Sequence, residues 1–503
     1  MNDQMIMANG QFAAATPESQ GIRSESIIRL MDAIIGSGIE LHSLYVIRNG
    51  MVVAAGNAKP VTAKSFHRLQ SAAKALISTA VLFAVQEGLI GLDDKVVDYF
   101  PEHLPDDMDE KFHRLTVYHL LTMTSGHDAD TFKRMRESGS WVREFFSIPP
   151  KYEPGTFFLY NNGIPHLLAC LIHKTAGAQL PEYLQPRLAE PLGLDIVYGY
   201  NRQGEIDGPL ICMTPESFVK FALLYLQEGE WEGKRILDRE LVRMAGSALV
   251  SNAHRDRPDR DFQAGYGFQL WRNAAGGYRM AGGGGQYAVI YPDANLAVVT
   301  LAYSQNDHRI PELVEKCLYR EIQARPYPEN PRMRMELYDR LERFTLAPSP
   351  ASAASSRSAA ISGKVFAFEP NEAGLERFSI DFVEDRAILR YTQHGKAMEA
   401  ACGLRGDWAV NKGEVLAEND YTEFFGRTLG HEPGETLLSG GWTDDFTFKI
   451  HVRSHAYLAT GMIICDYRFD TCTITLIPAH LRVRDPLTKA MGEYRPVVLT
   501  AKS

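Results

Sequence analysis

Residues 71–90 read SAAKALISTAVLFAVQEGLI, and this stretch is the clearest guide to the fold of the first half of the chain. Its apolar side chains cover more than one face of the helix that the pattern predicts, which is typical of a helix buried on all sides. Ahead of it, Arg48-Asn49-Gly50 separates two apolar runs, and Asn-Gly in that position is the strongest short signal of a β-hairpin. A buried helix that follows sheet segments indicates a mixed α/β unit.

The segments after the buried helix continue this mixed pattern. Residues 92–250 are rich in helical patterns, and one predicted helix opens with Thr214 as its N-cap and Pro215 as its first residue. Three β-like runs follow, separated by turn residues, at 265–271, 285–291 and 296–303. A helix over about 311–324 is expected to close this unit on its sheet.

The composition changes near residue 350, where small and polar residues replace the alternating pattern. Beyond that point apolar residues recur with the period of two that half-buried strands show: Phe378, Ile380 and Phe382; Phe446, Phe448, Ile450 and Val452; Cys472, Ile474 and Leu476. We therefore predict a first domain over 12–345, a linker over 346–361 and a C-terminal antiparallel β barrel or sandwich over 362–486.

The overall composition narrows the function class. The 503 residues are 45% hydrophobic and 23% charged, as in ordinary globular proteins, and the net charge of −9 lacks the basic footprint of a nucleic-acid binder. The most apolar later run, 75–84, is far shorter than the ~20 residues of a membrane span, and residues 1–20 lack a secretory pattern. Six cysteines without Cys-x-x-Cys pairing favour buried free thiols. We expect a cytoplasmic protein with small-molecule partners and no nucleic-acid or membrane partner.

Ser71 and Lys74 open the buried helix with the spacing Ser-x-x-Lys, which places hydroxyl and amine on one face. An apolar environment lowers the pKa of a lysine toward the neutral form that can accept a proton from serine. The alternative is that Ser71 is only a small residue packing a helix start. Ser217 and Lys220 have the same spacing, and we assign them to a solvated helix start.

Tyr160 and Asn162 form the only Tyr-x-Asn in the chain, after a turn at 153–156 that can bring them toward the buried helix. A tyrosine hydroxyl can pass a proton to a leaving group, and an asparagine amide can hold the lysine and the substrate. The alternative is a loop tyrosine followed by an asparagine turn.

A glycine run, AGGGGQ at 281–286, leads into a predicted strand. Glycines let a substrate lie against a strand edge, where a backbone N–H can complete an oxyanion hole. Gly284, Gly285 and Gln286 are therefore candidate substrate-binding residues. A phosphate loop is disfavoured because the run does not open a helix.

Taken in order, these residues resemble the serine β-lactamase-like hydrolases, which include class C β-lactamases, DD-peptidases, esterases of that superfamily and 6-aminohexanoate-dimer hydrolases. The resemblance runs from about 16 to 303 and extends to the family's usual surroundings at 87–94 and 120–127 and to Gln286-Tyr287 before Pro292. It implies an antiparallel sheet flanked by helices, with a helical subdomain and the site between them.

The same resemblance implies a role for each site residue. Ser71 would be the acylated nucleophile, Lys74 its base partner and Tyr160 the proton shuttle. Asn162 would orient the substrate, and the backbone amides of Ser71 and Gln286 would bind the oxyanion.

One departure from the family concerns the substrate. Where penicillin-recognising members carry Lys-Thr-Gly, this chain has Gly283-Gly284-Gly285, so the cation that faces a substrate carboxylate is missing. We predict a serine hydrolase that acts through an acyl-enzyme on a small ester or amide. The alternatives are β-lactamase or D-amino-acid peptidase activity, and a catalytically weak binding module.

Other chemistries find no support in the sequence. It has no Gly-x-Ser-x-Gly, His-Glu-x-x-His or Cys-x-x-Cys motif, and His451 and His455 are interpreted as surface residues. We expect no cofactor and no metal. The sequence leaves the natural substrate and the oligomeric state open.

Overall fold

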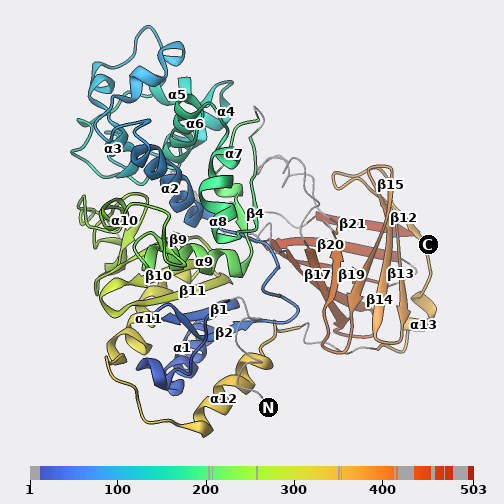
Figure 1. Cartoon of the computed structure of the whole chain (residues 1–503). Coiled ribbons are helices and arrows are strands. Elements are labelled where there is room, and N and C mark those ends of the chain that lie inside the picture. The colour runs from blue at the N-terminus through green and yellow to red at the C-terminus, as the bar shows by residue number, and fades with distance from the viewer. Residues whose placement is uncertain are drawn as a thin grey trace. The chain divides into compact units, whose positions relative to one another are not determined.

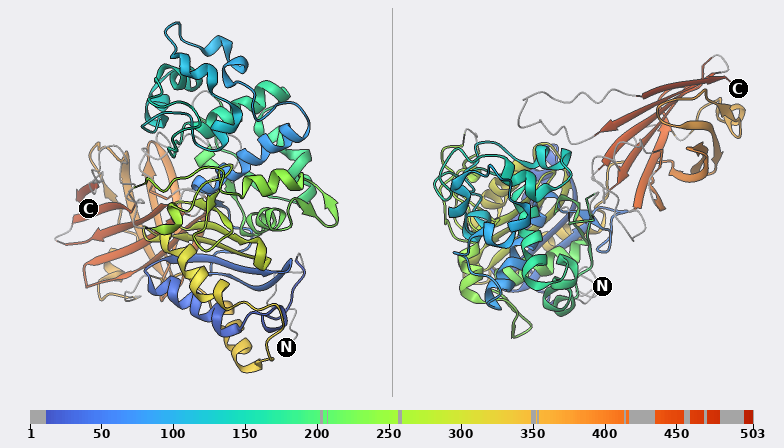
Figure 2. Two further views of the ribbon diagram at one scale, coloured as in Figure 1. Left: turned by 90° about the vertical axis from the view of Figure 1, so that its left-hand side faces the viewer. Right: turned by 90° about the horizontal axis from the view of Figure 1, so that it is seen from above.

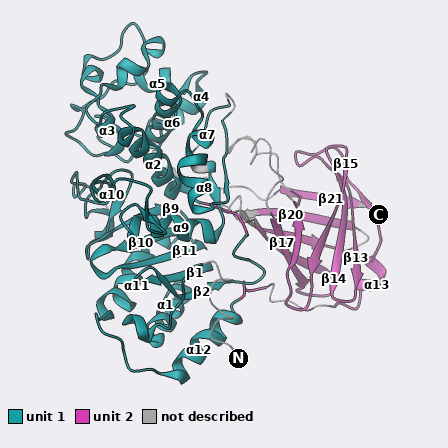
Figure 3. Ribbon diagram, viewed as in Figure 1, with its two compact units in different colours: residues 1–64, 69–344 teal, residues 65–68, 345–503 magenta. Residues whose placement is uncertain are grey.

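The computed structural model describes residues 12–201, 204–206, 208–255, 259–348, 352, 354–412, 415–416, 435–454, 459–468, 471–479 and 497–502. The chain forms two compact units (Figure 3). Unit 1 consists of residues 1–64 and 69–344, and unit 2 of residues 65–68 and 345–503. The domain boundaries drawn from the sequence stay predictions, and residues 349–351 and 353 of the expected linker lie outside the described residues.

Unit 1 contains a six-stranded antiparallel sheet in the order β2-β1-β11-β10-β9-β8. Its strands are β1 (Glu40–Arg48), β2 (Met51–Asn57), β8 (Trp271–Arg272), β9 (Tyr278–Gly282), β10 (Gln286–Tyr291) and β11 (Leu296–Tyr303). Asn49 and Gly50 join β1 to β2 with φ of 53° and 75°, as a two-residue hairpin turn requires. The predicted hairpin is confirmed, and so are the strands over 285–291 and 296–303.

The predicted strand over 265–271 is wrong. Within 265–271, the paired residues are Tyr266, which forms isolated bridges, and Trp271, which begins β8. Gly265 has φ of 108° and Gln269 has φ of 60°, and such left-handed conformations interrupt an extended strand. The third strand of this part of the sheet is β9, which the sequence analysis did not predict.

The buried helix is α2 (Ala73–Gln86), preceded by the 3₁₀ turn η3 (Gln70–Ala72). All but the last two residues of α2 are buried, as its apolar pattern predicts. It is four residues shorter at its C-terminus than residues 71–90, because Gly88 adopts φ of 70° and the N–H of Leu89 turns back to the carbonyl of Ala84.

Helices cover both faces of the sheet (Figure 1). The helices α1 (Ser24–Gly36), α11 (Ile310–Cys317) and α12 (Pro331–Glu342) pack together on one side, and α2 and α9 (Pro215–Leu226) lie on the other, against β9, β10 and β11. Thr214 caps α9 by accepting a hydrogen bond from the N–H of Ser217, as predicted. The helix predicted over 311–324 ends early, and prolines at 326 and 328 separate it from α12, which was not predicted.

Five of the other helices of unit 1 gather beyond one end of the sheet, at the top of Figure 1 and of the left view in Figure 2. They are α3 (Val117–Leu121), α4 (Phe132–Glu137), α5 (Trp141–Ser147), α6 (Ile164–Ala176) and α7 (Leu180–Leu184). The helices α8 (Glu190–Leu192) and α10 (Arg239–Ala245) lie closer to the sheet (Figure 1). The short strands of unit 1 are β4 (Ile196–Val197), β5 (Cys212–Met213), β6 (Glu230–Trp231) and β7 (Lys234–Arg235), whereas β3 (His67–Arg68) belongs to unit 2. The predicted helix-rich middle section is confirmed.

Unit 2 is built on one ten-stranded sheet in the order β15-β14-β13-β12-β21-β20-β19-β18-β17-β16. Besides the short helix α13 (Ser358–Ile361), its elements are β12 (Phe366–Ala367), β13 (Leu375–Val383), β14 (Arg386–Gln393), β15 (Lys396–Gly403), β16 (Ala409–Lys412), β17 (Glu435–Trp442), β18 (Thr447–Ser454), β19 (Ala459–Asp466), β20 (Thr471–Ala479) and β21 (Val497–Lys502). A further pairing of β15 with β17 nearly closes the sheet into a barrel. The predicted fold class is confirmed in both units.

Two further observations bear on the sequence analysis. Within the described part of the chain, no helix combines the length and the apolarity that crossing a bilayer demands. All six cysteines are free thiols, and four of them are buried, whereas Cys170 and Cys317 are only half-buried.

Candidate active site

The turn that carries Ser71 lies against the end of strand β9. A Cβ atom on Gly282 would stand 2.1 Å from the carbonyl oxygen of Leu69 and 3.0 Å from the backbone nitrogen of Ala72. Only a glycine allows so close an approach of two backbones. Gln70, next to Ser71, has φ of 51°, an uncommon conformation for a residue with a side chain. The end of β9 and the start of α2 are thus held in direct contact at the candidate nucleophile.

Lys74 joins the two predicted motifs. Its Nζ donates to Ser71 Oγ at 2.8 Å and to Asn162 Oδ1 at 2.9 Å. Lys74 is 2% exposed and Ser71 is half-buried, so the amine is shielded from water while the hydroxyl remains reachable. The structure therefore brings Ser71 and Asn162 each within hydrogen-bond distance of Lys74.

Tyr160 completes the cluster from the side. Lys74 Nζ lies 4.8 Å from the centroid of the Tyr160 ring, which stacks on Trp271 with a centroid distance of 5.2 Å. The ring also meets the edge of Tyr266 at 6.3 Å. Burial raises the pKa of the Tyr266 phenol, and the neighbouring Tyr160 raises it further. Tyr266 therefore stays neutral and contributes an aromatic surface against which Tyr160 packs. The aromatic residues fix the plane of the half-buried Tyr160 ring.

Asp130 fixes the amide of Asn162, and the sequence analysis did not single it out. Its Oδ2 accepts a hydrogen bond from Asn162 Nδ2 at 2.6 Å, and its Oδ1 accepts one from the backbone N–H of Asn162 at 3.0 Å. Because the carboxylate holds the NH₂ group, the amide oxygen must face Lys74. Asp130 is a positioning residue in a loop, where no motif marks it.

The glycine run forms the turn between β9 and β10. Gly284 and Gly285 have φ of 89° and 109°, which only glycine adopts readily. A Cβ atom on Gly283 would meet nothing within 4 Å, so the position where the family has a lysine borders open space. These glycines lie in the turn that follows the strand packed on the Ser71 turn.

The Gln286 side chain bridges this turn and β11, because its Nε2 also donates to the carbonyl of Gly283 at 3.3 Å. It is fully buried, its Nε2 donates to the carbonyl of Ala302 at 2.7 Å, and its Oε1 accepts from the N–H of Ala302. The side chain fastens the turn to β11, and any role of Gln286 toward a substrate rests on its backbone.

Two arginines approach the aromatic residues beside Tyr160. The guanidinium of Arg255 lies 4.9 Å from the centroid of the Trp271 ring. Arg279 is fully buried, donates to the backbone carbonyls of Arg272 and Asp261, and burial lowers its pKa. Arg279 is therefore held by backbone carbonyls, and Arg255 is the second cation beside these aromatic residues.

Residues 29–313, more than half of the chain, match the family model described as Beta-lactamase. The chain belongs to the beta-lactamase family. The resemblance stated from the sequence is confirmed. The residues matched include Ser71, Lys74, Tyr160, Asn162 and the glycine turn, whereas unit 2 lies almost wholly outside them.

Similar proteins of the beta-lactamase family carry different names. Esterase EstB of Burkholderia gladioli is 26% identical over 212 residues, which are 36% of this chain and 54% of that protein. A Beta-lactamase of Escherichia coli is 28% identical over 138 residues, 27% of this chain and 36% of that protein. The chain thus spans about half or less of the length of these curated relatives. The octameric penicillin-binding protein homologue from Pyrococcus abyssi is a similar solved structure, with 17% identity, a TM-score of 0.46, and coverage of 90% of this chain and 97% of that one.

The second Ser-x-x-Lys pair is not at a solvated helix start, which corrects the sequence analysis. Ser217 is fully buried, and its Oγ accepts a hydrogen bond from the N–H of Asp195 at 2.7 Å. Lys220 donates to the carbonyl of Gly193 at 2.9 Å. In this beta-lactamase-family chain the second pair supports the segment that follows α8, and of the two pairs it is the Ser71 pair whose lysine bonds to its serine.

Asn161, between Tyr160 and Asn162, is a further residue that the sequence analysis passed over. Its Oδ1 accepts hydrogen bonds from Thr131 Oγ1 at 2.9 Å, from the N–H of Thr131 and from the N–H of Gly163. It is fully buried and ties the Tyr-x-Asn loop to the loop that holds Asp130. The two adjacent asparagines thus have different roles: Asn161 holds the loop, and Asn162 faces the lysine.

Proposed function

We propose that the chain is a serine hydrolase that cleaves a small ester or amide through an acyl-enzyme formed on Ser71. The observation that carries this proposal is the 2.8 Å contact between the buried Lys74 amine and the reachable Ser71 hydroxyl. Membership of the beta-lactamase family and the similarity to a protein named as an esterase support it.

The proposed reaction uses each residue of the cluster once. Lys74 Nζ accepts the proton of Ser71 as Oγ attacks the carbonyl carbon, and Tyr160 passes a proton to the leaving group. Asn162, held by Asp130, orients Lys74 and the substrate. The backbone N–H of Ser71 and one from the turn 283–286 stabilise the oxyanion, and water then releases the acid.

Labelling with a fluorophosphonate probe tests the nucleophile, since such probes react with activated serines. We expect one label per chain, mapped to Ser71 by peptide mass spectrometry, and no label in Ser71→Ala. Ser217→Ala is the matched control, because Ser217 shares the Ser-x-x-Lys spacing but is buried, and it should label like the unchanged chain. A label on another serine, or labelling of Ser71→Ala, would overturn the assignment.

The substrate proposal rests on the open glycine position. A charge-assisted pair with a substrate carboxylate is worth about 1.5–3 kcal/mol, so its absence should weaken anionic substrates by about one to two powers of ten. We expect kcat/KM for neutral short-chain p-nitrophenyl esters to exceed that for the cephalosporin nitrocefin by at least this factor.

The alternative activity, β-lactam or D-amino-acid peptide cleavage, is supported by the similarity to proteins named as beta-lactamases. Arg255 is the residue to vary in order to distinguish the two, because its guanidinium lies 4.9 Å from the centroid of the Trp271 ring that stacks on Tyr160. Nitrocefin turnover equal to ester turnover, lost selectively in Arg255→Ala, would contradict the neutral-ester proposal. A binding module without turnover would show no ester cleavage at all.

The proposal also covers the partner of the chain and its cellular compartment. We infer a small-molecule partner and a reducing, cytoplasmic compartment, and the six free cysteines support the compartment. The acidic net charge of −9 supports the absence of a nucleic-acid partner.

A further inference from the structure

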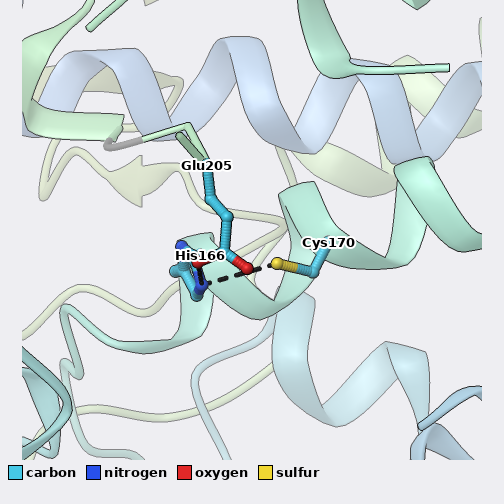
Figure 4. A group of neighbouring side chains, drawn as sticks. All are labelled: His166, Cys170 and Glu205. Carbon is cyan, nitrogen blue, oxygen red and sulfur yellow. Dashed lines mark hydrogen bonds and ion pairs between the residues drawn. The ribbon is translucent and has the colours of Figure 1, made fainter. Parts of the chain in front are cut away.

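Three side chains with metal-binding atoms converge at a place that the proposed reaction does not use (Figure 4). His166 and Cys170 come from one face of α6, four residues apart, and Glu205 reaches them from the segment after that helix region. One ligand atom from each residue lies within 4.8 Å of the other two. His166 is buried, whereas Cys170 and Glu205 are half-buried, so the cluster sits at the edge of the core.

The distances suit a small divalent ion. His166 Nε2 lies 3.4 Å from Cys170 Sγ and 3.3 Å from Glu205 Oε2. Zinc bound tetrahedrally at 2.0–2.3 Å separates its ligand atoms by roughly 3.3–3.8 Å. Both distances from the histidine nitrogen already fall in that range, and the third needs a shift of about 1 Å at most.

The orientation of His166 separates a metal site from a catalytic thiol. In a Cys-His-acid triad the acid binds the imidazole nitrogen that does not face the nucleophile. Here thiol and carboxylate both face Nε2, while Nδ1 lies 3.3 Å from the carbonyl oxygen of Ile206. An N–H bonded to a backbone carbonyl is the usual partner of a metal-ligating histidine, since it presents the other nitrogen's lone pair to the ion.

We propose that His166, Cys170 and Glu205 form a binding site for a zinc-type divalent ion, with the fourth position left to water. A nitrogen, a sulfur and a carboxylate oxygen suit zinc, whereas magnesium and calcium prefer oxygen ligands alone. Binding releases the Cys170 thiol proton to solvent as the sulfur–metal bond forms. Asn201 Nδ2 donates to Glu205 Oε2 at 3.0 Å and holds the carboxylate in place.

The site would act on structure rather than on the ester reaction. It would clasp α6, which begins two residues after Asn162, to the segment that contains Glu205 and Ile206. An ion that binds the folded chain alone stabilises that chain by mass action. The sequence analysis expected no metal and did not single out these residues, since Glu205 lies far from His166 and Cys170 along the chain.

Cobalt titration of the full chain, after treatment with a chelator, tests the proposal. We expect one Co²⁺ per chain, with the near-ultraviolet absorption of a thiolate–cobalt bond and the visible bands of tetrahedral cobalt. The Trp141 ring centroid lies 4.7 Å from that of His166, so part of the tryptophan fluorescence should be quenched together with these bands. Zinc should displace cobalt and raise the Tm.

Variants decide whether these three residues are the ligands. Cys170→Ser should lose the thiolate–cobalt band, and Glu205→Gln, at a half-exposed position, should weaken binding at least tenfold, or by about 1.4 kcal/mol. Cys317→Ser, which removes the other half-buried thiol, is the matched control and should bind like the unchanged chain. No stoichiometric cobalt binding, or an unchanged band in folded Cys170→Ser, would overturn the proposal. Fluorophosphonate labelling of Ser71 is independent of either result.

Discussion

Lys74→Ala is expected to lower kcat/KM for a p-nitrophenyl ester by about 10³-fold, with little loss of folded protein. The amine is the group bonded to Ser71 Oγ, and without it the hydroxyl has no base to take its proton. Tyr160→Phe removes only the phenol oxygen and keeps the ring stacked on Trp271. Because the two residues act in one proton network, the double variant should be about as slow as either single variant.

The measurement is steady-state ester hydrolysis with all three variants and a matched control. Lys220→Ala is that control, since Lys220 follows the other Ser-x-x-Lys serine but bonds only to the carbonyl of Gly193. It should keep nearly full activity. Losses that multiply in the double variant would contradict a shared network.

Gly282→Ala should be the most damaging change of a single methyl group near the site. The new Cβ would stand 2.1 Å from the carbonyl oxygen of Leu69, so either β9 or the Ser71 turn must move. Displacing a nucleophile by about 1 Å costs about 10²-fold in rate, and we expect at least that loss in fluorophosphonate labelling rate.

The neighbouring position gives the comparison for Gly282→Ala. Gly283→Ala adds the same methyl group where no atom lies within 4 Å, and the rate of Ser71 labelling should fall by much less. Circular dichroism of both variants separates local displacement from unfolding. Equal labelling rates in the two variants would show that the backbone contact at Gly282 does not position Ser71.

The sequence analysis was accurate where a feature depends on residues that are close together in the chain. The Asn49-Gly50 hairpin, the capped helix α9 and the strand β11 were predicted because turn chemistry, capping and apolar runs act over a few residues. The run 265–271 has the apolar pattern of a strand, but Gly265 and Gln269 turn the backbone out of it. Pairing partners along the chain are needed to see that β9 takes its place.

The candidate site shows the same division. Ser71, Lys74, Tyr160 and Asn162 could be found because their spacing carries chemistry, and the structure places them together. Asp130 could not be found in this way, because it acts only by binding the NH₂ group of Asn162, and that contact is visible only in the structure. The side-chain direction of Gln286 depends in the same way on β11, which follows it in the chain.

The near closure of the sheet in unit 2 has a consequence for self-association. Edge strands of an open sheet offer unpaired N–H and C=O groups to other chains. Proteins limit such aggregation with edge strands that are short or charged. Here the pairing of Gly403 with Ser439 occupies part of β15, the first strand of the sheet order. The last strand in that order, β16, has only four residues and ends at Lys412. Because this pairing joins strands at the two ends of the described order, unit 2 offers less free backbone for strand addition by another chain than a fully open sheet would.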